Sequence, residues 1–187
     1  FARLASRIRI QAEVMEDAPT VFEIMTAMGM LYFAEKQCDL VMLEVGMGGR
    51  LDSTNVIRTP EAAVITSIGL DHTKELGDTL EKIAGEKGGI IKTGGTVIVD
   101  GSNTAVMPVF EKICRERDAL LVTSAPEQIR NVVLSPAGEV FDYKDLKELS
   151  LSLTGVYQMN NAAVVIETLR VLEQKGYRIG EAALRKG

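Results

Sequence analysis

The chain has 187 residues, 46% of them hydrophobic, which is enough for one sizeable domain with a buried core. Its formal net charge is −5, and acidic and basic residues are mixed without a basic stripe, which argues against nucleic acid as the main partner. No run reaches the roughly 18 apolar residues of a membrane span and no signal peptide is recognisable, so we expect a cytoplasmic protein without a membrane segment. The lone cysteines Cys38 and Cys114 are expected to be small core residues in a reducing compartment.

The first predicted elements alternate between helix and strand. Val21–Lys36 has apolar residues at helical spacing, and Pro19 and Thr20 supply a start for the helix. Asp39–Glu44 is a continuous apolar run that predicts a buried strand. The following elements are the strands Ala62–Ser67, Gly95–Asp100 and Ala119–Thr123 and the helices Thr79–Ile91 and Thr104–Glu116. This alternation predicts an α/β fold, a mostly parallel sheet with helices on both faces.

After Pro126 the pattern changes to short strands around turns. The strands Asn131–Leu134, Val140–Tyr143 and Leu149–Leu153 predict a small antiparallel β insert. Gln158–Lys175 then returns to helix, with an apolar stripe of Ala162, Val165, Ile166, Leu169 and Leu172. We expect residues 1–187 to form one domain.

Three stretches place polar residues at or just beyond predicted strand ends, where open parallel sheets bind ligands. In "LEVGMGGRLDSTN", Glu44 closes a strand; it is either a ligand-facing carboxylate or one that is capped or bound to water. The glycines "GMGG" alone are a weak signal, because no GxGxxG opens a helix here, and this counts against a nicotinamide oxidoreductase.

The other two stretches each carry one candidate residue. His72, the only histidine, lies in "SIGLDHTKELG"; it is either structural or, with Asp71 beside it, a metal or phosphate ligand. Lys87 lies in "IAGEKGGIIK" inside a predicted helix and precedes two glycines, each of which costs about 1 kcal/mol in a helix. It is either an ordinary lysine near a helix end or a residue that needs free space beside it.

Together these stretches resemble the folylpolyglutamate synthase/dihydrofolate synthase family, a branch of the Mur-type amide ligases. The resemblance rests on "PTVFEIMTAMGMLYFAE", "LEVGMGGRLDSTN", "TSIGLDHTKELGDTLEKIAGEKGGIIK" and "LTGVYQMNNAAV", in the order and spacing of the family's central ATPase domain. It implies an enzyme that uses MgATP to phosphorylate a carboxylate, after which an amino acid's amine attacks the acyl phosphate. The implied partners are ATP, L-glutamate and folate or dihydropteroate, and the implied full-length protein is a monomer.

The resemblance also implies residue roles. Glu44 and His72 match magnesium ligands, and Lys87 matches a lysine that becomes carbamylated and bridges towards the second metal. Gln158 and Asn161 match an element near the adenine nucleotide. On the substrate side, the implied binding residues are Phe22, Gly49, Arg50, Asp52 and Ser53, with Gly46–Asp52 forming a flexible loop against the pterin. Hard oxygen ligands suit Mg²⁺, and the glycines after Lys87 would leave room for a carbamate.

The sequence departs from the family pattern at three points. It contains no GxxxxGK[ST] motif, it ends before the family's smaller C-terminal domain, and Tyr157 stands where many relatives have histidine. We therefore expect a partial central domain that is inactive by itself. The alternatives are another Mur-type ligase acting on cell-wall precursors and a non-catalytic nucleotide-binding module.

Overall fold

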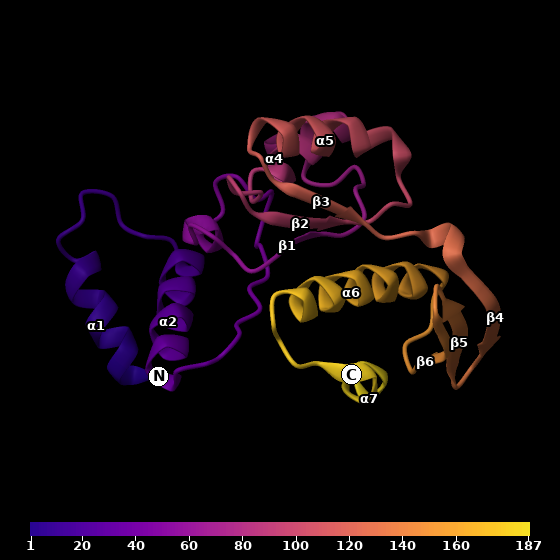
Figure 1. Cartoon of the computed structure of the whole chain (residues 1–187). Coiled ribbons are helices and arrows are strands. Elements are labelled where there is room, and N and C mark those ends of the chain that lie inside the picture. The colour runs from indigo at the N-terminus through magenta and orange to yellow at the C-terminus, as the bar shows by residue number, and fades with distance from the viewer. The chain divides into compact units, whose positions relative to one another are not determined.

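The computed structural model describes all residues from Phe1 to Gly187 (Figure 1). The chain folds into two compact units. Unit 1 is Phe1–Ile57 and unit 2 is Arg58–Gly187. The expectation of one domain over residues 1–187 stays a prediction.

Unit 1 consists of two helices and a loop. Helix α2 (Val21–Lys36) has the predicted bounds, and it begins with a capping box in which Glu23 N donates to Thr20 Oγ1 and Thr20 N donates to Glu23 Oε2. Helix α1 (Ala2–Ala12), which the sequence analysis missed, packs beside α2. Arg3 and Arg7 of α1 both form ion pairs with Glu35 of α2. A short 3-10 helix, η1 (Ser53–Val56), ends the unit.

The predicted strand Asp39–Glu44 is wrong. These residues lie outside any ladder, and Leu40 and Met42 are 47% and 95% exposed. An apolar run becomes a strand only where a neighbouring strand satisfies its backbone groups, and no strand pairs with this segment. Cys38, just before it, is also exposed, whereas Cys114 is buried as expected.

Unit 2 contains a parallel sheet, sheet A, in the order β1-β2-β3. The connections between its strands are helical, as the sequence predicts. Its elements are β1 (Ala63–Ile65), α3 (Thr73–Leu76), α4 (Leu80–Gly88), β2 (Thr96–Val99), η2 (Thr104–Val106), α5 (Met107–Glu116) and β3 (Leu120–Thr123).

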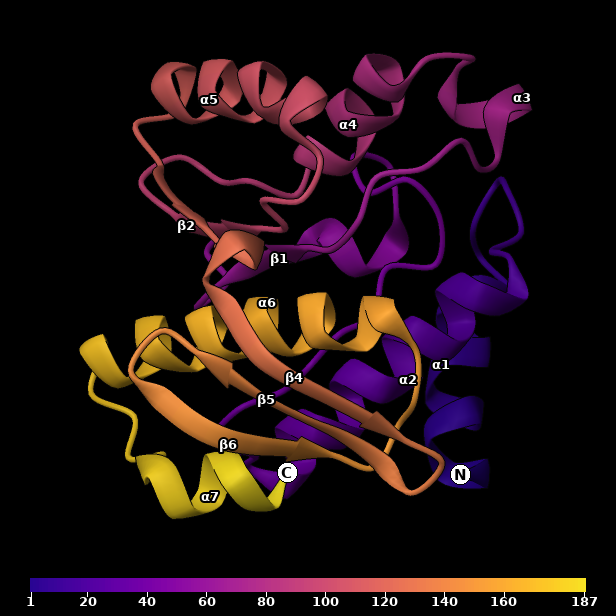
Figure 2. The ribbon, with the colours of Figure 1, turned by 90° about the vertical axis from the view of Figure 1, so that its right-hand side faces the viewer.

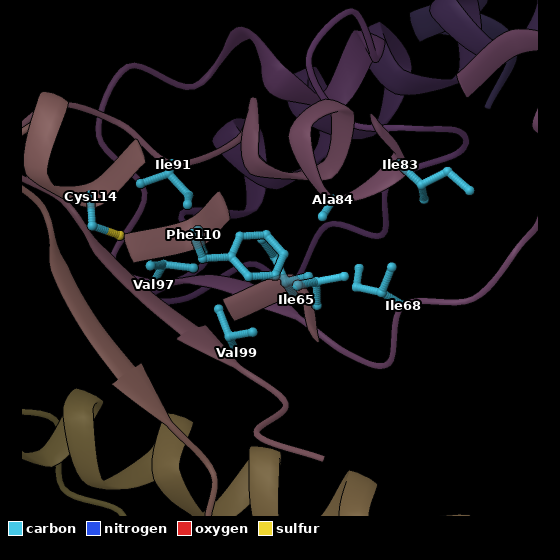
Figure 3. Packing of buried hydrophobic residues seen from close by; sticks show 11 residues of the cluster. Ile65, Ile68, Ile83, Ala84, Ile91, Val97, Val99, Phe110 and Cys114 are labelled. Atoms are coloured by element: carbon cyan, nitrogen blue, oxygen red, sulfur yellow. The ribbon is translucent and has the colours of Figure 1, made fainter. Parts of the chain in front are cut away.

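The central strand β2 separates two apolar layers because successive side chains point to opposite faces. Val97 and Val99 join the cluster formed with α4 and α5, which includes Ile83 and Phe110 (Figure 3). Ile98 points to the other face and packs with the long helix of the unit. Helices therefore cover both faces of sheet A, and the predicted α/β fold class is confirmed.

The predicted antiparallel insert is also confirmed, as sheet B in the order β4-β5-β6. Its elements and those beside it are η3 (Pro126–Gln128), β4 (Ile129–Ser135), β5 (Gly138–Tyr143), β6 (Leu146–Leu151), α6 (Val156–Gln174) and α7 (Gly180–Lys186).

Helix α6 lies between the two sheets (Figure 2). Val164 packs with Ile98 of sheet A, while Ala163 and Ile166 pack with Phe141 of sheet B. The predicted single stripe is therefore incomplete, and Val165, which it includes, is 54% exposed. Burial on two sides spreads the apolar positions around the helix, so no one stripe describes them.

Candidate functional site

The predicted site residues are divided between the units. Unit 1 carries Phe22, Glu44, Gly49, Arg50, Asp52 and Ser53, and unit 2 carries His72, Lys87, Gln158 and Asn161. In unit 1 the loop contacts α2 through Ser53, and in unit 2 Gln158 and Asn161 are hydrogen-bonded to each other.

The Asp52 carboxylate holds the glycine loop in one arrangement. Its Oδ2 accepts hydrogen bonds from the backbone N–H groups of Gly46 (2.9 Å) and Met47 (3.0 Å). Its Oδ1 accepts from Thr54 N (2.9 Å) and Thr54 Oγ1 (2.6 Å). Burial alone would raise the pKa of Asp52, but these four donors outweigh it and hold that pKa below its usual value. The loop is thus tied by hydrogen bonds within itself, and the flexibility that the resemblance implies for it stays a prediction.

Phe22 and Ser53 connect this loop to α2. A Cβ on Gly46 would lie 2.7 Å from Cε1 and Cζ of Phe22, so the ring contacts the loop only because residue 46 is glycine. Ser53 Oγ lies 3.1 Å from Thr26 Oγ1 on α2. The sequence analysis missed Thr54 and Thr26; the Asp-x-Thr spacing from Asp52 to Thr54 was the available signal, because such pairs close tight turns.

Glu44, Gly49 and Arg50 surround the same loop. Glu44 is exposed on the extended segment just before it, Gly49 is buried with φ of 150°, and Arg50 is exposed. Gly48 has φ of 66°, in the left-handed region that favours glycine. Gly48 and Gly49 therefore allow the backbone to turn through conformations that other residues rarely adopt.

His72 stands at the N-cap of the short helix α3, with φ of 47°. Its side chain is 51% exposed, and Nε2 lies 3.6 Å from Asp71 Oδ2. Its backbone N–H donates to Asp71 Oδ1 at 2.8 Å. The ring lies beside the neighbouring carboxylate and leaves about half of its surface accessible.

Lys87 lies in the last turn of α4, half-buried and without an ion pair. The glycine that follows it also takes part in helix packing. A Cβ on Gly88 would lie 2.5 Å from Ile113 Cδ1 and 3.8 Å from Phe110, so its missing side chain admits α5. The expectation that the two glycines after Lys87 leave room for a carbamate stays a prediction.

Gln158 and Asn161 lie in the first turns of α6. Asn161 Nδ2 donates to Gln158 Oε1 at 3.2 Å, and Gln158 N donates to Gly155 O at 2.7 Å. Tyr157, between them and Gly155, is 61% exposed. The two amide side chains thus form a pair next to the start of the helix.

In unit 1, Glu44 offers an exposed carboxylate, the kind of oxygen ligand that hard cations prefer. In unit 2, His72 offers an accessible imidazole, a ligand type that suits transition metals. No group of three or more His, Cys, Asp or Glu side chains gathers where it could hold a metal ion. No helix is both long and apolar enough to cross a membrane.

Comparison with known proteins identifies relatives along the chain. The Mur ligase middle domain family matches residues 5–169. The dihydrofolate synthase/folylpolyglutamate synthase of Bacillus subtilis (strain 168) is 42% identical over 199 residues, covering 100% of this chain and 46% of that protein. The folylpolyglutamate synthase (FPGS) of Lacticaseibacillus casei is 37% identical over 176 residues, covering 91% of this chain and 41% of that protein.

Solved structures agree with these relatives. The apo form of L. casei FPGS superposes with a TM-score of 0.87 at 32% identity, over 97% of this chain and 46% of that one. An FPGS–AMPPCP–folate complex matches with the same TM-score of 0.87, identity of 32% and coverage of 97% and 46%. The chain thus spans less than half the length of the curated relatives it matches. Because the family match covers most of its residues, the chain belongs to the Mur ligase middle domain family.

Proposed function

We propose that the protein carrying this segment is an ATP-dependent ligase that adds L-glutamate to a folate or to dihydropteroate. The observation that supports this most directly is 42% identity, over the whole chain, to a dihydrofolate synthase/folylpolyglutamate synthase. The likeness to an FPGS structure that contains AMPPCP and folate supports the same nucleotide and substrate class.

The proposed reaction has two steps. A carboxylate oxygen of the substrate attacks the γ-phosphorus of ATP, forming an acyl phosphate and releasing ADP. The neutral amine of glutamate then attacks the acyl carbon, the C–O bond to phosphate breaks, and the amine loses a proton as the amide forms.

Each candidate residue has a proposed place in this chemistry. Glu44 would hold one Mg²⁺ ion and His72 a second, and bound Mg²⁺ would neutralise charge on the transferred phosphoryl group. Lys87, half-buried and without an ion pair, would be carbamylated and so become an anion facing the metal. Gln158 and Asn161 would bind the nucleotide.

On the substrate side, Phe22, Gly49, Arg50 and Ser53 would line the pterin site. The four hydrogen bonds that Asp52 accepts suit a residue that shapes this site through the loop. We expect the full-length protein to be a monomer, with the P-loop and the smaller ligase domain outside these 187 residues.

The test measures ATP- and Mg²⁺-dependent incorporation of labelled glutamate by the full-length protein, with dihydropteroate and tetrahydrofolate offered separately. Lys87→Arg keeps the charge but cannot be carbamylated, so we expect activity to fall about a hundredfold or more. Lys82→Arg is the matched control, because Lys82 lies on the same helix and forms only an exposed ion pair with Asp78. It should keep its activity within about twofold.

Two results would count against the proposed reaction, and a third would count against the expected need for a P-loop. ATP binding without turnover would favour a non-catalytic nucleotide-binding module. Turnover with a cell-wall precursor and none with pterins would favour another Mur-type ligase. Robust activity of the 187-residue chain alone would contradict the expected need for a P-loop. A carbamate would be supported if bicarbonate increased the intact mass of the full-length protein by one CO₂. The same treatment should leave the mass of Lys87→Arg unchanged.

A further inference from the structure

Glu139 is a buried carboxylate on the central strand of sheet B, next to the turn between β4 and β5. It lies on the central strand β5, opposite Leu134 of β4 and Leu151 of β6, and it is 2% exposed. A carboxylate in such a position is costly unless hydrogen bonds or an opposite charge compensate for its lost hydration. No basic side chain forms an ion pair with it, so the compensation comes from elsewhere.

The carboxylate has one direct contact of this kind. Glu139 Oε1 accepts a hydrogen bond from the backbone N–H of Gly155 at 2.6 Å, across 16 residues of sequence. Its Oε2 is buried without a hydrogen-bond partner. One carboxylate oxygen of Glu139 therefore binds Gly155, while the other is buried without a hydrogen bond.

Gly155 is the residue from which α6 starts. Its φ is 136°, and a Cβ there would lie 2.9 Å from the Tyr157 ring, so no other residue fits without strain. Its carbonyl accepts the hydrogen bond from Gln158 N at 2.7 Å, and Gln158 in turn accepts from Asn161. A continuous series of hydrogen bonds runs from Glu139 through Gly155 to the Gln158–Asn161 pair.

The sequence of α6 explains why a carboxylate is needed. The helix has no side-chain N-cap and no acidic residue in its first turn, although it is 19 residues long. The N-terminus of a helix carries unpaired N–H groups and a partial positive charge, and a nearby carboxylate stabilises both. Glu139 supplies from sheet B the acidic group that the helix itself lacks.

Glu139 is not needed to attach sheet B to the helix. Lys144 of the β5–β6 turn forms a 2.8 Å ion pair with Glu167 in the middle of α6, and Asp145 pairs with Arg170 one turn further on. Phe141 and Leu149 pack against the same helix. The effect of Glu139 is therefore local to the start of α6.

We propose that Glu139 is a positioning residue for nucleotide binding, fixing Gly155 and through it the Gln158–Asn161 pair. This rests on the proposed function, in which that pair contacts ATP. Glu139 itself touches no substrate, since its free oxygen is buried in the protein.

The experiment compares Glu139→Ala, Glu139→Gln and Gly155→Ala. In the full-length protein, Glu139→Ala should raise KM for ATP about tenfold while kcat stays within about threefold. Glu139→Gln keeps an acceptor for Gly155 N–H and should restore KM to within about threefold of the parent. Gly155→Ala disturbs the same turn from the other side, and combining it with Glu139→Ala should raise KM by less than the product of the separate effects.

Hydrogen exchange in the 187-residue chain supplies a second measurement. Amides 155–161 should exchange faster in Glu139→Ala, while those of β2 keep the parent's protection, which shows that the variant is folded. Glu127→Ala is the matched control, because it removes an exposed carboxylate from the turn before β4. It should change neither exchange nor KM.

Specific results would overturn the proposal. These are an unchanged KM in Glu139→Ala, a fall in kcat with KM unchanged, or a Glu139→Gln variant as impaired as Glu139→Ala. A changed preference between ATP and GTP in Glu139→Gln would mean that Glu139 contacts the base, contrary to the proposal. A parent protein without ATP-dependent ligation would refute the proposed function instead, and the exchange data would still decide whether Glu139 holds the turn.

Discussion

At the scale of single residues, Asp52 shows how a residue can shape a site by acting on the backbone. All four of its hydrogen bonds come from Gly46, Met47 and Thr54, so its carboxylate has little capacity left for a ligand. Gly46 follows Glu44 by two residues and contacts the Phe22 ring. Asp52 therefore holds the backbone of the residue that contacts Phe22, the expected pterin contact.

Replacing Asp52 with asparagine should release the loop. The amide NH₂ group cannot accept from two backbone N–H groups, so the hydrogen bonds to Gly46 and Met47 or those to Thr54 are lost. We expect the amide exchange on the side that loses its acceptor, either Gly46 and Met47 or Thr54, to rise about tenfold or more when measured by NMR. Asp39→Asn, an exposed change shortly before the same loop, should leave it unaltered. Equal exchange in Asp52→Asn and the parent would show that the loop does not depend on this carboxylate.

At the scale of elements, the contact of α4 with α5 depends on the absence of one side chain. Gly85 and Gly88 are both helical positions of α4, but a Cβ on Gly85 meets nothing within 4 Å, whereas one on Gly88 meets Ile113 Cδ1 at 2.5 Å. Gly85 is an interior position, where glycine costs about 1 kcal/mol relative to alanine, whereas Gly88 is the last residue of the helix, where the propensity cost is smaller. Only the cost at Gly88 is offset by close packing.

This difference predicts different outcomes for alanine at the two positions. Gly85→Ala should raise the free energy of unfolding by about 0.5–1 kcal/mol, from helix propensity alone. Gly88→Ala should give no gain or a loss, because overpacking costs about 1–3 kcal/mol. Urea denaturation of each variant measures both values.

Ile113→Val identifies the atom responsible, since it removes the Cδ1 group that a Cβ on Gly88 would contact. In that background Gly88→Ala should be less unfavourable than in the parent, because the close contact is gone. If Gly88→Ala remained equally unfavourable there, the cost would lie somewhere other than this contact.

In sheet B, the Asp142 carboxylate connects the three strands by hydrogen bonds. Asp142 on β5 accepts from Glu148 N (2.9 Å), Asn131 Nδ2 (2.7 Å) and Lys147 Nζ (3.1 Å), which ties together all three strands. The N–H of Glu148 and the Asn131 amide are the main reasons why the pKa of Asp142 falls to about 2. Asn131 and Glu148 both have positive φ, so these bonds hold the two irregular points of the sheet.

The lowered pKa predicts how stability depends on pH. Because the folded state holds the Asp142 proton less tightly than the unfolded state, its contribution is present above about pH 4 and is lost towards pH 2. Asp142→Asn should therefore have a lower Tm at pH 7 and a smaller decrease in Tm between pH 4 and pH 2. The matched control is Asp118→Asn. Asp118 is exposed after α5, and its φ of 49° is one that asparagine also adopts readily. If Tm decreased between pH 4 and pH 2 as much in Asp142→Asn as in the parent, the acid sensitivity would come from other carboxylates.

At the scale of the whole molecule, the sequence predicts those elements whose signals are local. The bounds of α2 follow from the Thr20 cap and the apolar spacing after it, and the residues of β2 from a short apolar run between glycine and aspartate. The parallel sheet, the antiparallel insert and the long helix α6 follow from the alternation of such signals.

The errors arise where contacts distant in sequence decide. Asp39–Glu44 has the composition of a buried strand but no strand pairs with it. Val165 belongs to an apparent stripe, yet α6 is buried on two other sides. For the candidate site, the sequence identifies which residues carry chemistry, but the functions of Asp52 and Gly88 depend on neighbours that only the fold reveals. The roles of Glu44, His72 and Lys87 stay predictions.

The two units differ greatly in their buried cores. Among the buried hydrophobic side chains, only Leu4 and Met28 belong to unit 1, while unit 2 holds all three clusters of buried residues. A unit of about 60 residues is already marginal in the surface that folding buries, and one with so small a core has little to offset its conformational entropy. Unit 2 has two sheets and the helix that packs on both.

We therefore expect residues 58–187 to fold independently and residues 1–57 not to do so. The longer fragment should unfold in one cooperative transition in urea, with a Tm within a few degrees of the corresponding transition of the whole chain. The shorter fragment should show fast amide exchange throughout α1, with at most partial protection in α2, where the Thr20 cap favours the helix locally. A fragment 58–187 that is molten by near-UV circular dichroism would mean that its clusters require unit 1, because a core that is sufficient by itself keeps its side chains ordered after the other unit is removed.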